Sequence, residues 1–353
     1  MVTPRLLPLI FRPYNSQPHW ITKEYLPMER FSCTTAARLA NEDPIATAHP
    51  VQTYVLVECP LPWAAKAWDS PQIPDLLRQT IHQVTEHYPA VKALLINQDR
   101  TRSSPHRRVI IYQRQNREFV SGFDRYEFVI DTLDEAASLI QNFFKGIFLR
   151  KFLIQKVQDI LVCTHGSRDQ CCGRYGEPFY AQAYKIVRSQ DHNRQVWRSS
   201  HIGGHRFAPT AMTFPDGRYY ARLDAFSFNS LLQRSGDTGL LTPIYRGSSL
   251  IPEALQELER SLLLRYGWDW LGFAMKAEMR SMDPETPEAG ILAQIQWQDY
   301  AQEIMTAQAH LFPDPTRTVS LQSSCQMSPE STYIKYILKN LVIARPLTTA
   351  IAS

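Results

Sequence analysis

The sequence predicts an α/β protein in which one β-α-β-β-β-α unit occurs twice and a C-terminal extension follows. The order of apolar segments in residues 51–155 recurs in residues 156–270, at an offset of about 104 residues that aligns Cys59 with Cys163. A length of 353 residues corresponds to about two domains at roughly 150 residues each. Hydrophobic residues make up 44% of the chain, enough for a sizeable core, so intrinsic disorder is excluded as the main state. We expect a central sheet with helices on its faces.

The first copy follows an irregular, proline-containing segment, residues 1–50, with one short helix at 28–40. Apolar and β-branched runs predict strands at 54–59, 91–97 and 108–114 and a further strand within 117–131. Apolar residues at helical spacing predict a helix within 71–89. Thr132 is the expected N-cap of a second helix over 132–148, with Glu135 as its capping-box partner.

The second copy repeats this order, and the rest of the chain follows it. Strands are predicted at 158–163 and 195–200, a hairpin at 211–223 around Asp216-Gly217, and helices at 177–190 and 225–236. A helix over 250–267 is expected to end at Gly267, and residues 281–290 have the composition of a linker. Beyond it we expect a strand at 291–297 and a helix at 331–344, without a recognisable fold for residues 271–353.

Charge and cysteine usage narrow the function classes. Lys and Arg number 38 and Asp and Glu 34, and a net charge of +4 is too small to indicate nucleic-acid binding. No apolar run approaches the roughly 18 residues of a membrane span. No cleavage site typical of a signal peptide follows the N-terminus, so we expect a cytoplasmic protein. Six cysteines are too few for a disulfide scaffold.

Four side chains of the kinds that bind soft or borderline metals lie within 43 residues: Cys163, Cys172, His201 and His205. Cys163 ends a predicted strand, and CTHGSRDQCCG is expected to continue as a loop with C-x8-C spacing. The H-x3-H pair lies in SSHIGGHRFAP, where two glycines and Pro209 favour a second loop. Two ligand pairs at two strand ends can converge on one metal centre. Spacing alone leaves zinc and an iron–sulfur cluster about equally favoured, and C-x7-C spacing would make Cys171 the second thiolate.

Three segments together resemble the sucrase/ferredoxin-like family: CTHGSRDQCCGRYG, SSHIGGHRFAPTAMTFPDGRYYARLD and DPIATAHPVQTYVLVECPLPW. The resemblance covers about residues 30–270. It implies two thioredoxin-like domains in tandem, at 51–155 and 156–270, of which only the second holds a 2Fe–2S cluster. The two domains are flanked by the irregular segment 1–50 and by the C-terminal extension 271–353. The resemblance also implies a cis proline at Pro209.

Carried onto this sequence, the family pattern makes Cys163 and Cys172 the ligands of one iron and His201 and His205 those of the other. It favours Cys172 over Cys171, which is then a packed neighbour. The remaining cysteines, Cys33, Cys59 and Cys325, are expected to be structural or incidental.

The function implied by the resemblance is electron transfer or redox sensing with an unidentified protein partner. The oligomeric state stays open. The alternative is a structural Cys2His2 zinc module without redox activity. Hydrolysis, suggested by the family name, is disfavoured because no convincing pair of catalytic carboxylates is present. A thiol–disulfide enzyme would usually carry C-x-x-C, which is absent. We therefore expect an electron carrier rather than a substrate-converting enzyme.

Overall fold

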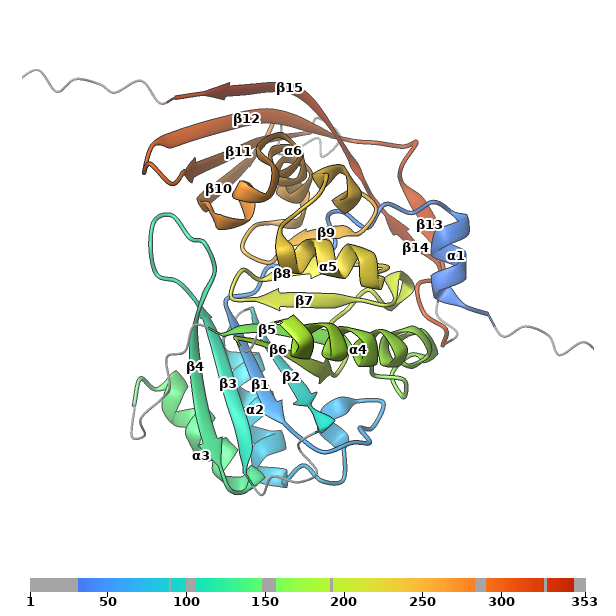
Figure 1. Cartoon of the computed structure of the whole chain (residues 1–353), viewed down its shortest axis with the longest axis vertical. Coiled ribbons are helices and arrows are strands. Elements are labelled where there is room, and N and C mark those ends of the chain that lie inside the picture. Colours follow the sequence, from blue (N-terminus) through green and yellow to red (C-terminus); the bar gives the residue numbers. More distant parts are fainter. Residues whose placement is uncertain are drawn as a thin grey trace, which may run out of the picture. The chain divides into compact units, whose positions relative to one another are not determined.

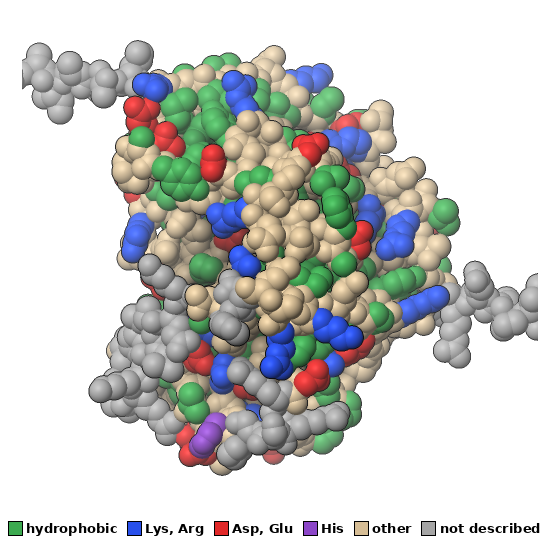
Figure 2. All heavy atoms as spheres, viewed as in Figure 1, with side chains coloured by type: hydrophobic (Ala, Val, Ile, Leu, Met, Phe, Trp, Pro, Cys, Tyr) green, Lys and Arg blue, Asp and Glu red, His purple; other side chains and the backbone are tan. Residues whose placement is uncertain are grey.

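The computed structural model describes residues 31–88, 90–99, 106–147, 157–190, 193–282, 290–326 and 329–345 (Figure 1). The predicted irregular segment 1–50 is described only from residue 31, and most of the predicted linker 281–290 lies outside the described residues. Among the helices of the described ranges, none combines the length and the apolar character that crossing a bilayer requires. On the face in Figure 2, described side chains of both charge signs are interspersed, as the small net charge leads one to expect.

Both halves have the expected β-α-β-β-β-α order. The first half comprises β1 (Thr53–Glu58), α2 (Asp75–His87), β2 (Val91–Asn97), β3 (Arg107–Arg114), β4 (Phe123–Ile130) and α3 (Leu133–Phe144). The second comprises β5 (Gln158–Cys163), α4 (Gln170–Gln190), β6 (Arg194–Ser199), β7 (Ala211–Phe214), β8 (Arg218–Tyr220) and α5 (Ala225–Gln233). A short helix, α1 (Cys33–Leu39), precedes them, and β9 (Tyr245–Ser248) and α6 (Gln256–Tyr266) follow. The described 3-10 turns are η1 (Ala67–Asp69), η3 (His205–Phe207), η4 (Thr238–Leu241), η5 (Glu253–Leu255) and η6 (Gly267–Gly272).

The two halves contribute equivalent strand orders to one nine-stranded sheet, β4-β3-β1-β2-β6-β5-β7-β8-β9. In each half the first strand pairs parallel with the second and antiparallel with the third. The halves join where β2 and β6 run antiparallel, through Ile96 opposite Ser199 and Asn97 opposite Arg198. The repeat predicted from the sequence is therefore present in the sheet topology.

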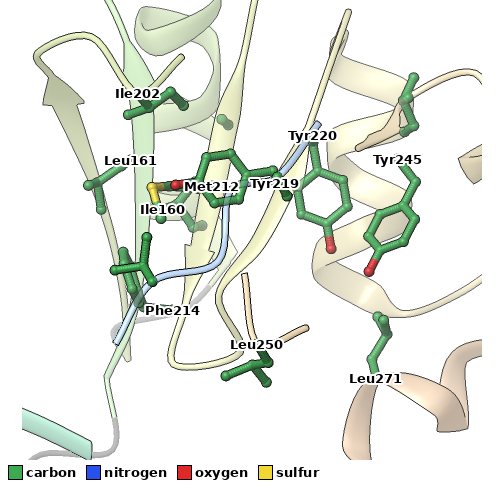
Figure 3. Close-up of a cluster of buried hydrophobic side chains, with 14 of the residues drawn as sticks. Ile160, Leu161, Ile202, Met212, Phe214, Tyr219, Tyr220, Tyr245, Leu250 and Leu271 are labelled. Atoms are coloured by element: carbon green, nitrogen blue, oxygen red, sulfur yellow. The ribbon is translucent and has the colours of Figure 1, made fainter. Parts of the chain in front are cut away.

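Alternation along β1 shows how the halves share their core. Val55 and Val57 face a cluster that includes residues of α2 and α3, whereas Tyr54 and Leu56 point into a cluster with residues of the second half. Part of that second cluster is drawn in Figure 3, where Phe214 and Met212 lie near Ile160 and Leu161. Across the halves, Tyr112 stacks on Phe214 with ring centroids 4.0 Å apart. One face of the strands of the first half is thus covered by the helices of that half, and the other face packs against the second half.

A buried charged network also joins the halves. Asp159, on β5, is fully buried and accepts hydrogen bonds from Arg125 Nε at 2.8 Å and Trp197 Nε1 at 2.7 Å. Tyr112 donates its hydroxyl to the same carboxylate. Because a buried carboxylate is tolerated only with such partners, this network fixes the packing of β3 and β4 against β5.

Helix α4 begins at Gln170, seven residues before the predicted start at 177. Asp169 Oδ1 accepts the backbone N–H of Cys171 at 2.9 Å, the bond expected of an N-cap residue. The prediction that CTHGSRDQCCG runs entirely as a loop is therefore wrong, because both adjacent cysteines lie in the first turn of a helix. Thr132 is indeed the N-cap of α3, but its side chain makes no capping hydrogen bond.

The C-terminal extension forms a second sheet, β10-β11-β12-β15, in which all neighbours are antiparallel. Its strands are β10 (Ala274–Ser281), β11 (Ile291–Gln298), β12 (Ile304–Pro313) and β15 (Tyr336–Ala344), and β13 (Val319–Leu321) pairs with β14 (Ser331–Tyr333). The strand expected at 291–297 is confirmed. The helix predicted at 331–344 is wrong, because β-branched residues there pair with β12 and expose alternate side chains.

Candidate metal centre

Cys163 is held at the carboxyl end of β5 by the sheet and by a close helix. Its N–H donates to Thr210 O at 3.0 Å, and the next N–H, of Thr164, donates to Ser199 O at 3.1 Å. Gly176 of α4 packs directly on this turn, since a Cβ there would lie 2.0 Å from the Cys163 carbonyl oxygen. The absence of a side chain at residue 176 thus brings the start of α4 close to the end of β5.

Three of the four predicted ligands lie together. The donor atoms of Cys163, Cys172 and His201 are all within 4.8 Å of one another. His201 Nδ1 is 3.8 Å from Cys163 Sγ and 3.6 Å from Cys172 Sγ. Both thiols are buried and the imidazole is half-buried. Of the two adjacent cysteines, Cys172 is therefore the one whose sulfur lies beside Cys163.

His205 lies beside this group rather than in it. Its ring centroid is 5.0 Å from that of His201, but its Nδ1 is 3.3 Å from Asp169 Oδ2 and 3.5 Å from Cys33 Sγ. Because Nδ1 is engaged by the carboxylate, Nε2 is the nitrogen available to a metal. Burial is the largest cause that lowers the pKa of His205 to about 4, so the imidazole is neutral at pH 7, as a ligand must be.

The loop between the two histidines requires glycine. Gly203 and Gly204 have φ angles of 98° and 73°, in the region that side chains disfavour. A Cβ on Gly204 would lie 2.6 Å from the guanidinium of Arg246, which donates to Gly203 O at 3.0 Å. Arg246 is buried, and this burial lowers its pKa to about 10. A buried cation, which the sequence analysis missed, therefore supports the histidine loop.

His165 fixes the backbone at His201. Its Nδ1 is 3.2 Å from the His201 N–H, and its Nε2 is 2.8 Å from the carbonyl oxygen of Ala64 in the first half. The first nitrogen must accept and the second must donate, which specifies the neutral tautomer. Burial is the largest cause lowering the pKa of His165, in agreement with this state. Pro209, four residues after His205, follows a cis peptide bond, as the resemblance implied.

Electrostatics distinguish the two thiols of the group. The hydrogen bond between them is the largest cause that lowers the pKa of Cys163 and the largest that raises the pKa of Cys172. Cys163 is thus the preferred thiolate. Cysteine thiolates and histidine imidazoles are donors that zinc and iron–sulfur centres use.

The sequence profile of the sucrase/ferredoxin-like family matches residues 44–247, which is more than half of the chain. The chain belongs to the sucrase/ferredoxin-like family. The matched residues include Cys163, Cys172, His201 and His205. Among solved structures, the chain is similar to a thioredoxin-like [2Fe-2S] ferredoxin from Aquifex aeolicus. The identity is 12%, the match covers 24% of this chain and 84% of that chain, and the TM-score is 0.20. No curated protein matches this chain.

The donor set fits a small iron–sulfur cluster. Two buried sulfurs lie with the half-buried imidazole of His201, and the half-buried ring of His205 is 5.0 Å from that of His201. The hydroxyl of Thr164, next to Cys163, is buried without a hydrogen-bond partner among the described residues. An unpaired buried hydroxyl costs free energy, and a sulfur acceptor of a bound group would remove that cost.

Proposed function

We propose that this protein binds one 2Fe–2S cluster and acts as an electron carrier or redox sensor. The observation that carries the proposal is the group of two buried cysteines, Cys163 and Cys172, with half-buried His201 in a member of the sucrase/ferredoxin-like family. In this proposal residues 51–155 and 156–270 are tandem thioredoxin-like domains, and only the second binds the cluster. The equivalent strand orders of the halves support the division.

Each ligand has a distinct role. Cys163 and Cys172 bind one iron through buried sulfurs, and His201 and His205 bind the other at the half-buried edge. Asp169 holds Nδ1 of His205 and so presents Nε2 to the metal. When bound, a 2Fe–2S cluster supplies reversible one-electron transfer. The imidazole side is the more exposed, so we propose that the protein partner docks there.

Arg246 and the histidine loop shape the electrostatics of the site. The guanidinium hydrogen-bonds the loop backbone and interacts attractively with the Cys163 thiolate. A fixed buried cation stabilises additional negative charge, so we expect it to favour electron uptake. We also propose a cytoplasmic location, because six cysteines are too few for the disulfide scaffold of a small secreted protein.

A zinc module is the second candidate, and one observation favours it. Three donors, from two cysteines and one histidine, form the compact group, while His205 lies apart. Three protein ligands suffice for a zinc ion with one open position. The zinc candidate predicts zinc without sulfide and no dependence on His205.

The test is metal and acid-labile sulfide analysis of protein purified without air. The cluster predicts about two irons and two sulfides per chain, and loss of most of the iron in His201→Ala and His205→Ala. His106→Ala is the matched control, since His106 pairs with Asp131 in the first half and should leave iron unchanged. Absence of iron together with zinc that Cys163→Ser removes and His205→Ala does not would overturn the cluster in favour of zinc.

A further inference from the structure

A second group of donor atoms lies beside the first and comes from distant parts of the chain. Cys33 is in α1, Cys171 is in the first turn of α4, and Cys325 is between β13 and β14. With the carboxylate of Asp169, their donor atoms are all within 4.8 Å of one another. In Figure 1, α1 lies beside the β13–β14 pair. The residues come from positions separated by up to 292 residues, so only the fold brings them together.

The sulfur spacing is close to that of a metal site. Cys171 Sγ is 3.2 Å and Cys33 Sγ 3.5 Å from Cys325 Sγ. Two thiolates bound to one tetrahedral zinc, each at about 2.3 Å, have sulfurs about 3.8 Å apart. Small adjustments of side-chain torsions would therefore place all three sulfurs around one ion. Three thiols in mutual contact gain little from one another, because S–H is a weak donor and sulfur a weak acceptor.

Asp169 supplies the fourth donor and holds the group in place. It is buried, and its Oδ1 is 3.7 Å from Cys33 Sγ. Its two oxygens accept the backbone N–H groups of Cys171 and Cys325, each at 2.9 Å, and Oδ2 accepts the Ser324 hydroxyl at 3.0 Å. These bonds orient the carboxylate and both cysteine backbones, as supporting bonds do around bound metals.

We propose that Cys33, Cys171, Cys325 and Asp169 form a second metal site, which takes a thiolate-preferring, tetrahedral divalent cation such as zinc. Three sulfurs and one carboxylate complete a tetrahedron and leave no position for substrate, so the role is structural. The ion would join α1, the start of α4 and the C-terminal extension. It would also immobilise Asp169, which contacts Nδ1 of His205 at the neighbouring centre.

This assignment accounts for the adjacent cysteines. Successive residues on a helix point about 100° apart, so neighbours cannot readily face the same ion. Cys172 directs its sulfur toward Cys163 and His201, whereas Cys171 directs its own toward Cys33 and Cys325. Each cysteine of the pair thus serves a different centre.

The experiment measures zinc and iron in the full-length protein, purified without air from medium containing both metals. We expect about one zinc per chain in wild type. Cys325→Ser should lose the zinc and keep the iron, and Cys163→Ser should lose the iron and keep the zinc. Cys59→Ser is the control, because Cys59 is a buried cysteine outside both groups and should leave both metals unchanged. Failure of the proposed cluster would remove iron only, so the two hypotheses are separable.

A second measurement avoids dependence on a variant that folds poorly. Cadmium added to zinc-stripped wild type should produce the near-ultraviolet sulfur-to-metal band of a three-thiolate site at one equivalent, and Cys33→Ser should weaken it. Wild type that contains no zinc and takes up no cadmium would overturn the proposal. Equal zinc content in wild type and Cys325→Ser would also overturn it, as would a Cys171–Cys325 disulfide in protein kept under reducing conditions.

Discussion

Replacing Gly176 by alanine should displace the start of α4 and disturb the proposed centre. The new Cβ would lie 2.0 Å from the carbonyl oxygen of Cys163 and 3.0 Å from its carbonyl carbon. Restoring a tolerable contact requires helix and strand to separate by about 1 Å or more, as over-packing of a dense interior demands. Both contacting atoms belong to the backbone, so no side chain can rotate away.

The expected change in the free energy of unfolding combines two opposed contributions. Over-packing costs about 1–3 kcal/mol, and a backbone contact this short belongs at the upper end. Alanine in a helix interior regains about 1 kcal/mol relative to glycine. We therefore expect a net loss of about 2 kcal/mol in the free energy of unfolding. A 1 Å shift also exceeds the roughly 0.2 Å tolerance of metal–ligand distances, so iron content should fall more steeply than stability.

The assay is urea unfolding of the apoprotein followed by far-ultraviolet circular dichroism, together with iron analysis of protein purified without air. Gly173→Ala provides a graded comparison, because its Cβ would approach the Cα of Gly166 to 2.9 Å, a much milder contact. Its iron content should exceed that of Gly176→Ala. Wild-type stability and full iron content in Gly176→Ala would refute the packing argument.

Three further predictions address the ligands, the core and a buried charge. Cys172→Ser should lose the iron while Cys171→Ser retains it, because only the first sulfur lies with Cys163; iron analysis showing the reverse would exchange their roles. Asp159→Ala should lower the free energy of unfolding by about 3 kcal/mol, since it leaves Arg125 buried with a partner removed. Asp159→Asn keeps an acceptor for Trp197, so urea titration should show a smaller decrease in its free energy of unfolding. Equal decreases in the two variants would contradict this explanation. Burial lowers the pKa of Lys335 from 10.5 to about 8, so between these pH values the unfolded chain binds more protons. As pH rises from 8 to 10.5, the free energy of unfolding of wild type should therefore increase relative to that of Lys335→Met by up to about 3 kcal/mol. This gain should be lost as pH falls through 8. A difference between the two proteins that does not depend on pH would exclude the lowered pKa of Lys335.

Local patterns in the sequence predict most of the first two-thirds of the fold. The apolar, β-branched run in β1 and the helical spacing in α2 are properties of neighbouring residues, and the Asp216-Gly217 hairpin needs only a four-residue turn signal. The paired motifs around Cys163 and His201 likewise indicate the centre, because each pair lies on one short segment.

Other features depend on contacts that the sequence does not display. The early start of α4 follows from capping by Asp169, and β15 is a strand because β12 offers it an antiparallel partner. The grouping of Cys33, Cys171 and Cys325 has no local signature at all. Tertiary contacts between distant segments override local propensity in each of these cases.

The visible absorption spectrum of wild-type protein purified without air tests the central claim most directly. The proposed centre predicts a brown protein whose absorption is bleached by dithionite and returns on reoxidation, with about two irons per chain. A colourless protein that carries zinc at Cys163, Cys172 and His201, and shows no change on adding dithionite, would contradict the proposal.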